Sequence, residues 1–488
     1  MIHNFVKKEK QTNKLKRYIK SILLVVLLFI LYVLVGGIVP FIKMKDVSQE
    51  YKDSYSAKNY YSDTVGVDRA AIVETSDEAM DARIRMIQAA KERILFSTFS
   101  MKTDEASERI CAALYDAAER GVKVYMIIDG LSGSWDMKKA PMFYALGSNE
   151  NVTIKYYNMF KVYAPWTFNG RLHDKFIVTD DKMLLLGGRN TSNYFLGTYD
   201  QTVLSYDREV FVYNTDEDAK KSVISQVETY FDSLWKSKYS EVYYDKIPKW
   251  KREKAKVAKK QFKTVLNEMK SEKPELWVED FDYIQYTTPV NKITLVTNPI
   301  GIYSKQPYIW YTITSLMKDA EESVLIQSPY VVLNERMYKD LMEVEKDIPH
   351  CEILLNSMAV GDNICASADY KYSRKKILKT GIDVYEFQGE HSTHNKSFVI
   401  DDRLAMIGSF NFDMRSTYLD TESVLLIDGE EFANQLENNI RTMQKESLKV
   451  NLDGTYVQGE IEAKRMPNKK KIIFTFLPFV LRPIRFLL

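Results

Sequence analysis

The stretch "RLHDKFIVTDDKMLLLGGRN", residues 171–190, decides the fold because the chain contains its pattern twice. The second copy is "HSTHNKSFVIDDRLAMIGSFN", residues 391–411. In each copy a lysine follows the histidine after two positions and an aspartate follows it after seven. The two sets are His173, Lys175 and Asp180, and His394, Lys396 and Asp401. The chain has only five histidines, so this repeated spacing indicates a shared purpose.

Each copy predicts a β-hairpin. Alternate side chains of a strand share one face, so each histidine and its lysine are expected to point the same way. The aspartate pairs at 180–181 and 401–402 favour a tight turn into an antiparallel strand. That strand leads to Asn190 or Asn411, each seventeen residues after its histidine, and to Ser409 in the second copy. The hairpin is expected to bring an amide beside the histidine and lysine.

An acidic residue enters the next strand of each copy, Glu209 in "YDREVFVY" and Glu422 in "DTESVLLI". A carboxylate there can accept a hydrogen bond from the imidazole's other nitrogen and fix its tautomer. The alternative is that both histidines are satisfied core residues. That alternative must also explain two lysines, which are costly to bury without a partner. The repeat therefore favours one site to which both halves contribute.

Strands and helices alternate along each copy. Apolar runs at 93–99 and 122–130 flank a helical pattern at 105–121 that ends in glycine, and runs at 323–330 and 351–357 flank a helical stretch around 335–346. This order predicts a duplicated α/β fold with mixed sheets. The expected divisions are a first half at 67–245, a lysine-rich connecting region at 246–290 and a second half at 291–450. The lysine-rich run is interpreted as a solvated helix face, with contact to a membrane surface as the alternative.

Composition excludes several classes of function. The 488 residues carry a net charge of +2, without the excess of basic residues typical of nucleic-acid binding. The three cysteines match no metal-ligand spacing, and we expect neither a metal nor another cofactor.

The two ends of the chain predict membrane contact. A basic segment, 1–20, precedes the uncharged segment 21–42, whose 22 residues reach roughly 33 Å as a helix, enough to cross a bilayer core. A cleaved signal peptide is the alternative, but the segment is long and no small-residue cleavage site follows. The basic N-terminal side places the bulk of the chain on the outer face of the cell membrane. The apolar and basic tail, 467–488, is expected to lie in the membrane interface, with packing onto the globular core as the alternative.

The paired motifs resemble those of the phospholipase D superfamily, and residues 67–450 are most similar to bacterial cardiolipin synthases of that type. The resemblance implies a duplicated α-β-α sandwich whose halves share one active-site cleft. It also implies a catalytic set, which comprises His173, His394, Lys175, Lys396, Asp180 and Asp401. By analogy His173 is the nucleophile and His394 the general acid and base, although the near symmetry of the copies leaves the reverse assignment open.

The remaining residues of the site take supporting roles. Asn190, Asn411 and Ser409 are predicted to bind the substrate phosphate, and Glu209 and Glu422 to orient the histidines. Glu209 follows its histidine by thirty-six residues and Glu422 by twenty-eight, which predicts an insertion around 195–201.

The function implied is a membrane-bound phosphatidyltransferase. It would make cardiolipin from phosphatidylglycerol and a second phospholipid through a covalent phosphohistidine, with no metal required. Phospholipids in the bilayer are the expected partners and nucleic acid is not. A phospholipase D that releases phosphatidic acid and a membrane-bound nuclease are the alternatives. Water attacking the phosphohistidine would give the first, and a basic groove would mark the second.

Overall fold

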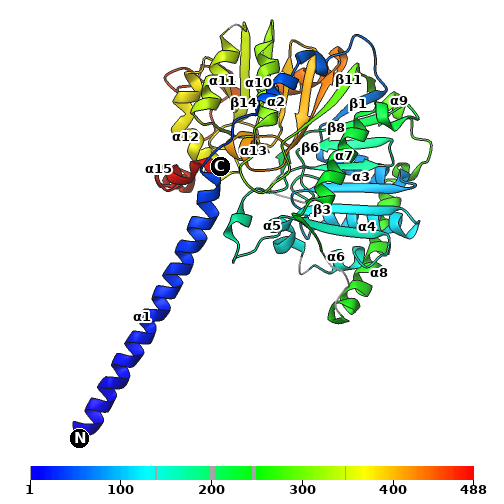
Figure 1. Cartoon of the computed structure of the whole chain (residues 1–488). Helices are drawn as coiled ribbons and strands as arrows, with labels where there is room; N and C mark the ends of the chain where they lie inside the picture. Colours follow the sequence, from blue (N-terminus) through cyan, green and yellow to red (C-terminus); the bar gives the residue numbers. More distant parts are fainter. Residues whose placement is uncertain (1, 138–139, 198–203, 244–248, 347) are drawn as a thin grey trace.

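Two halves, each built on one mixed β-sheet, make up the globular body (Figure 1). The computed structural model describes residues 2–137, 140–197, 204–243, 249–346 and 348–488. Within these ranges the first sheet has nine strands, in the order β10 (Thr288–Pro289), β1 (Asp68–Val73), β8 (Glu209–Asn214), β6 (Met183–Gly187), β5 (Phe176–Thr179), β2 (Arg93–Thr98), β3 (Lys123–Asp129), β4 (Val152–Tyr157) and β9 (Ser240–Val242). The second has eight described strands, in the order β11 (Lys292–Thr297), β20 (Ser423–Asp428), β18 (Leu404–Gly408), β17 (Ser397–Ile400), β12 (Ser323–Gln327), β14 (His350–Asn356), β15 (Asp383–Phe387) and β21 (Ser447–Lys449).

The duplication predicted from the sequence is confirmed by the topology. In each sheet three central strands run parallel, β2, β3 and β4 in one and β12, β14 and β15 in the other. The histidine hairpin of each half, β5–β6 or β17–β18, adds antiparallel strands beside them. The first strand of each hairpin, β5 or β17, begins just after the motif lysine, at Phe176 or Ser397. The histidine and lysine therefore lie in the segment that leads into the hairpin.

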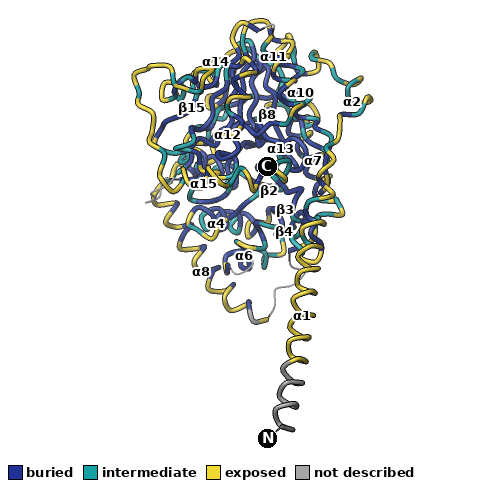
Figure 2. Tube along the Cα trace, turned by 90° about the vertical axis from the view of Figure 1, so that its left-hand side faces the viewer, coloured by how far each residue is buried: buried dark blue, intermediate teal, exposed yellow. Residues whose placement is uncertain are grey.

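Strand alternation explains how the layers form. Leu184 and Leu186 of β6 face a core shared by the two sheets, whereas Met183 and Leu185 face the outer core of the first half. The shared core also includes α7 (Val223–Lys236) and α14 (Glu430–Gln444). The outer faces are covered by α3 (Ser76–Ala89), α4 (Glu105–Glu119), α6 (Pro141–Leu146) and α8 (Lys249–Glu272) on the first half, and by α10 (Tyr308–Lys318), α11 (Glu335–Glu345) and α12 (Ile364–Leu378) on the second. Figure 2 shows the buried trace concentrated in these layers.

The lysine-rich region after the first half is an integral helix of that half. Ala255, Phe262 and Leu266 of α8 are buried in the outer core, and the helix packs against α4 and α6. The helix also carries an exposed face, as interpreted from its lysines. The spacing of its apolar residues, three or four apart, decides which side is buried.

The N-terminal helix α1 (Ile2–Ile38) extends away from the body (Figure 1). In the described part of the chain one helical stretch, Asn13–Phe41, is long and apolar enough to cross a membrane. The chain then returns along the second half through α2 (Gln49–Ser54), where the ring of Tyr51 stacks on Tyr308 at 3.8 Å between centroids.

The C-terminal tail forms helix α15 (Asn468–Leu481), followed by η7 (Arg482–Leu487). Phe474 and Leu481 are buried, and Arg485 Nε lies 2.5 Å from Asp369 of α12. Arg485 therefore pairs with protein instead of with anionic headgroups, so this end of the tail packs on the globular core, which is the alternative to the expected place in the membrane interface. Other apolar side chains of the helix, including Phe476 and Phe479, remain exposed.

Candidate active site

The two motif histidines lie at the seam between the halves, each beside a strand of the opposite half. The backbone N–H of His173 donates to the carbonyl of Thr421 at 3.1 Å, and that of His394 donates to the carbonyl of Tyr206 at 2.6 Å. The short strands β7 (Ser205–Tyr206) and β16 (Ser392–Thr393) pair in parallel across the same seam. Both histidines are thus held by backbone bonds that exist only when the halves are assembled.

Each imidazole is also paired with a carboxylate from the opposite half. Nδ1 of His173 lies 2.9 and 3.0 Å from the two carboxylate oxygens of Glu422, and Nδ1 of His394 lies 2.6 Å from Oδ2 of Asp207. Both carboxylates are fully buried. Because Nδ1 is engaged, Nε2 is the ring nitrogen that each histidine presents to a reacting group.

Glu209 does not orient a histidine, so that prediction is wrong. Its carboxylate lies 2.6 and 2.7 Å from the guanidinium of Arg83 and 3.6 Å from that of Arg189, in a buried ion cluster. The carboxylate that pairs with a histidine is Asp207, which lies two positions before Glu209 in the same "YDRE" stretch.

Strand register explains the error. Gly187 pairs with Glu209, whereas the corresponding Gly408 pairs with Val424. The counterpart of Glu209 is therefore Val424, and the counterpart of Glu422 is Asp207. The first copy is longer by six residues between histidine and carboxylate, and part of the predicted insertion, 198–201, lies outside the described residues.

Ser409 supports a carboxylate and is not placed to bind substrate through its hydroxyl, which corrects its predicted role. The buried hydroxyl donates to Oε2 of Glu422 and accepts the backbone N–H of Ser423 at 3.1 Å. Its counterpart is Gly188, where an added Cβ would fall 2.3 Å from Oδ1 of Asp207. Glycine is needed there because the shorter Asp207 side chain brings the backbone close.

The motif lysines are buried beside the histidines. The pKa of Lys175 is lowered to about 7, chiefly by burial; the charge of Glu422 opposes this shift and the charge of Lys396 contributes to it. Burial likewise lowers the pKa of Lys396 to about 8, although Asp207 and Glu422 oppose the shift. Each ammonium donates to the carbonyl of its own motif histidine. The cluster therefore holds two cations whose charge is sensitive to pH near neutrality.

The predicted asparagines follow the hairpins as expected. Oδ1 of Asn190 and Oδ1 of Asn411 are buried without a hydrogen-bond partner among the described residues. The amide nitrogen of Asn411 donates weakly to Ser416 Oγ at 3.4 Å. Aromatic rings line the histidines: Phe99 lies 5.5 Å from His173 between ring centroids, and Phe195 lies 5.1 Å from His394. The sequence carried no pattern that singled out these rings.

Asp180 and Asp401 are structural, which corrects their predicted place in the catalytic set. Both sit in the hairpin turns with φ near +48°. The carboxylate of Asp180 accepts the backbone N–H groups of residues 91–93 at 2.7–2.9 Å, and that of Asp401 accepts those of residues 321–323 at 2.8–2.9 Å. Each aspartate therefore fixes the start of the neighbouring central strand, β2 or β12, at the far end of the hairpin from the histidine.

Lys305 is a buried cation that sequence reasoning missed. Its Nζ has no hydrogen-bond partner among the described residues, and burial lowers its pKa to about 8 against the opposing charges of Asp420, Asp174 and Glu422. Lys305 comes from the loop between β11 and α10 and adds positive charge near Glu422, the carboxylate that pairs with His173. An isolated lysine in a loop gives no sequence signal for this position.

The electrostatic environments of the two histidines differ. Burial, with the charge of Lys175, holds the pKa of His173 well below its usual value, and the charge of His394 adds to this effect. Burial raises the pKa of Glu422 to about 8. Burial opposes ionisation of Asp207 too, but His394 and Lys396 outweigh it and lower the pKa of that carboxyl. Asp207 is therefore the more strongly ionised of the two histidine partners.

Comparison with known proteins agrees with this geometry. The sequence model of a family described as "Cardiolipin synthase, PLD-like domain" matches residues 83–235 and 313–444, which together exceed half of the chain and contain both motif histidines. The chain belongs to this PLD-like family.

Relatives and solved structures are similar over most of the PLD-like chain. An uncharacterized protein of Helicobacter pylori is 27% identical over 421 residues, covering 78% of this chain and 80% of that protein. Cardiolipin synthase C of Escherichia coli is 23% identical over 456 residues, covering 81% and 90%. The crystal structure of phosphatidylserine synthase from Haemophilus influenzae has a TM-score of 0.60 at 17% identity and covers 90% of this chain and 100% of that one. That likeness confirms the PLD-like fold.

Proposed function

We propose that this chain is a membrane-anchored phosphatidyltransferase that makes cardiolipin from phosphatidylglycerol and a second phospholipid. The observation that carries the proposal is the pair of imidazoles at one seam, each with Nδ1 bound to a carboxylate of the opposite half. Two imidazoles allow one hard displacement at phosphorus to be divided into two easier steps. The names of the curated relatives, cardiolipin synthases, support the choice of substrate.

In the first step, Nε2 of His173 attacks the phosphorus of a phosphodiester. In the form in which Glu422 is ionised, a population that grows as the pH approaches its raised pKa of about 8, Nδ1–H of the neutral His173 donates a hydrogen bond to this carboxylate, and the lone pair of Nε2 is free. As the P–N bond forms, the P–O bond to the leaving alcohol breaks, and the alkoxide takes a proton from His394. Lys175 and Lys396, with the amides of the two asparagines, stabilise charge on the non-bridging oxygens.

The electrostatic asymmetry supports this assignment of roles. A general acid must hold a proton before the reaction, and an ionised carboxylate stabilises an imidazolium. Burial and the charge of Lys396 lower the pKa of His394 too, but less than that of His173, because the ionised Asp207 opposes the shift and favours the imidazolium. His173, whose pKa burial lowers well below its usual value, is the more strongly neutral of the two and suits the nucleophile.

In the second step, a hydroxyl of phosphatidylglycerol attacks the phosphohistidine. Its proton passes to His394, the P–N bond breaks, and His173 is released with its lone pair. Water in place of this hydroxyl would make the enzyme a phospholipase D. An anchored catalytic body meets lipid hydroxyls at high local concentration, which favours transfer over hydrolysis.

The anchor and the tail support a position at the membrane. We assign the uncharged part of the Asn13–Phe41 stretch, from residue 21 onward, as a single span with the N-terminus in the cytoplasm and the body on the outer face, because basic residues crowd its N-terminal side. The exposed apolar side chains of α15, Phe476 and Phe479, are assigned to the interface of the outer leaflet, on the side of the body.

Expression in a host that lacks cardiolipin, followed by lipid mass spectrometry, tests the function. We expect cardiolipin from the native chain and none from His173→Ala at equal protein level. Accumulation of phosphatidic acid without cardiolipin would replace the transferase with a hydrolase. An unchanged lipid profile in cells with abundant folded protein would refute both.

A further inference from the structure

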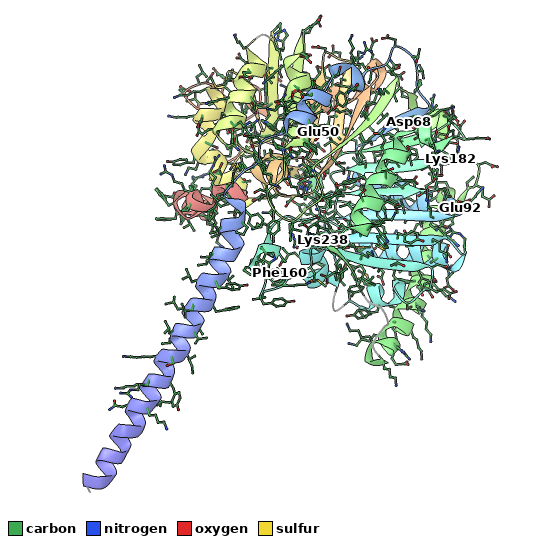
Figure 3. The ribbon with its side chains drawn as sticks, in the orientation of Figure 1. Glu50, Asp68, Glu92, Phe160, Lys182 and Lys238 are labelled. Carbon is green, nitrogen blue, oxygen red and sulfur yellow. The ribbon has the colours of Figure 1, made fainter. Side chains whose placement is uncertain are left out.

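The stretch "FKVYAPWTF", residues 160–168, lies against the N-terminal helix immediately before the first histidine motif. Figure 3 shows Phe160 on the body beside α1. The hydroxyl of Tyr32 donates to the carbonyl of Tyr163 at 2.8 Å, and the side-chain amide of Asn169 donates to the carbonyl of Gly37 at 2.9 Å. A Cβ at Gly36 would fall 2.4 Å from Cγ of Pro165, so glycine permits this close approach. The stretch is therefore docked on α1 at several levels.

The stretch is held together by its own hydrogen bonds. Thr167 Oγ1 donates to the carbonyl of Ala164 at 2.7 Å and accepts the backbone N–H of Lys161 at 3.1 Å. The amide of Asn158 donates to the carbonyls of residues 169 and 170 at 2.8 and 3.0 Å. Backbone groups placed at membrane depth need internal partners of this kind, since hydrocarbon offers none.

Apolar side chains of the stretch point outward from the body. Val162 is 50% exposed and Tyr163 is 71% exposed, next to the apolar segment of α1, where most side chains from Ile22 to Val35 are exposed. The charge of Lys161 is paired with Glu241 at 2.6 Å. The exposed patch thus continues the apolar surface of the helix and does not stand alone on a polar body.

The position of Tyr32 along α1 sets the depth of this contact. Lys20 is the last charged residue before the apolar segment, so it marks the near boundary of the bilayer core. Tyr32 lies twelve residues further, or roughly 18 Å along the helix axis, whereas the core is about 30 Å thick. Tyr32, and with it the carbonyl of Tyr163, therefore falls about 12 Å short of the far boundary. A helix tilt shortens the projection of these 18 Å on the membrane normal and leaves the contact deeper. A snorkelling Lys20 reduces the depth by several ångströms but does not bring the contact out of the core.

We propose that residues 160–168 form a loop inserted into the leaflet next to the catalytic body, where Val162 and Tyr163 contact phospholipid acyl chains. The inference rests on the membrane anchoring proposed above. Because the loop continues directly through Asn169 into His173, it places the first histidine motif at the surface from which a phospholipid must be drawn. The occupant of the patch is the acyl region of the bilayer that α1 spans.

A fluorescent label sensitive to polarity tests the insertion in the full chain reconstituted in phosphatidylglycerol vesicles. The background carries Cys365→Ser, because Cys111 and Cys351 are buried. We expect the label at Tyr163→Cys to emit at the wavelength typical of an apolar environment and to be quenched by lipids with a nitroxide on the acyl chain. A matched label at Val65→Cys is the aqueous control, since Val65 is 65% exposed and lies three residues before Asp68, which Figure 3 shows far from α1.

A third label separates the two proposals. Val25 of α1 is 65% exposed and lies within the apolar segment, so a label at Val25→Cys reports the anchor itself. If the label at 25 is quenched and the label at 163 behaves like the one at 65, the loop proposal is overturned and the anchor stands. If the label at 25 is also aqueous, the anchoring is overturned and the loop proposal falls with it.

Activity provides an independent measure. The double variant Val162→Asp, Tyr163→Asp keeps the backbone carbonyl that binds Tyr32 but places two charges in the leaflet, where each is strongly disfavoured. We expect turnover of vesicle phospholipid to fall at least tenfold and turnover of a soluble short-chain phospholipid to stay within about twofold. Val65→Asp should change neither. An equal loss on both substrates in a folded variant, or no loss on vesicles, would contradict the loop's role.

Discussion

Replacing Asp207 by asparagine is the sharpest test of the proposed division of labour between the histidines. The change keeps the size of the side chain but removes the anion 2.6 Å from Nδ1 of His394. Both groups are buried, and losing one partner of a buried charged pair costs about 3–5 kcal/mol. If that loss is felt in the transition state, kcat falls roughly 10²- to 10⁴-fold, at about 1.4 kcal/mol per tenfold.

The assay compares two substrates. With a natural phospholipid we expect the full loss in Asp207→Asn. With a phosphatidyl ester of an acidic phenol we expect most of the formation of the covalent intermediate to be restored, because a good leaving group needs no proton from His394. Glu422→Gln, which acts on the nucleophile His173, should not be rescued by the same substrate. Rescue of Glu422→Gln but not of Asp207→Asn would reverse the assignment.

Asp401→Asn is the matched control, since it makes the same chemical change in the half that carries His394. Its carboxylate accepts three backbone N–H groups at the start of β12 and does not contact the histidines. We expect a loss of about 1–3 kcal/mol in the free energy of unfolding, with kcat per folded molecule unchanged. Wild-type kcat in Asp207→Asn, or a loss of kcat in folded Asp401→Asn of the same size, would refute the reasoning.

Three further outcomes follow from the same contacts. The KM for an anionic phospholipid should rise as the pH increases from 7 to 9. Lys175 and Lys396, with pKa values of about 7 and 8, lose over this range the positive charge that is present below those values. Measuring KM against pH at fixed ionic strength tests this. Gly188→Ala should lower kcat with little change in KM, because its Cβ would meet Asp207 Oδ1 at 2.3 Å and displace the carboxylate from its histidine; steady-state kinetics and the crystal structure of the variant would show both effects. Arg485→Ala should release the tail from its ion pair with α12 and expose 467–488 to protease, with melting of the body largely unchanged; limited proteolysis that proceeds as in the native chain would argue against that contact as the lock.

Local patterns in the sequence were sufficient for the repeated unit. The histidine, lysine and asparagine positions and the hairpin between them follow from alternation along a strand and from turn chemistry at the aspartate pairs, both of which act over a few residues. The helix–glycine–strand order of each half likewise predicted α4, with Gly121 at φ +98° just beyond it, and the strand β3. The length and apolar composition of the segment before the body were sufficient to predict a candidate membrane span.

Only the tertiary structure decided which carboxylate serves which histidine. Glu422 lies on the same copy as His394 but bonds to His173, and Asp207 lies on the same copy as His173 but bonds to His394. No spacing within one copy can reveal an exchange between copies, because the exchange depends on how the two sheets pack. The docking of residues 160–168 on α1 has the same origin. Hydrogen bonds between residues more than a hundred positions apart are decided by packing, whereas hairpins and caps are decided by neighbours in the chain.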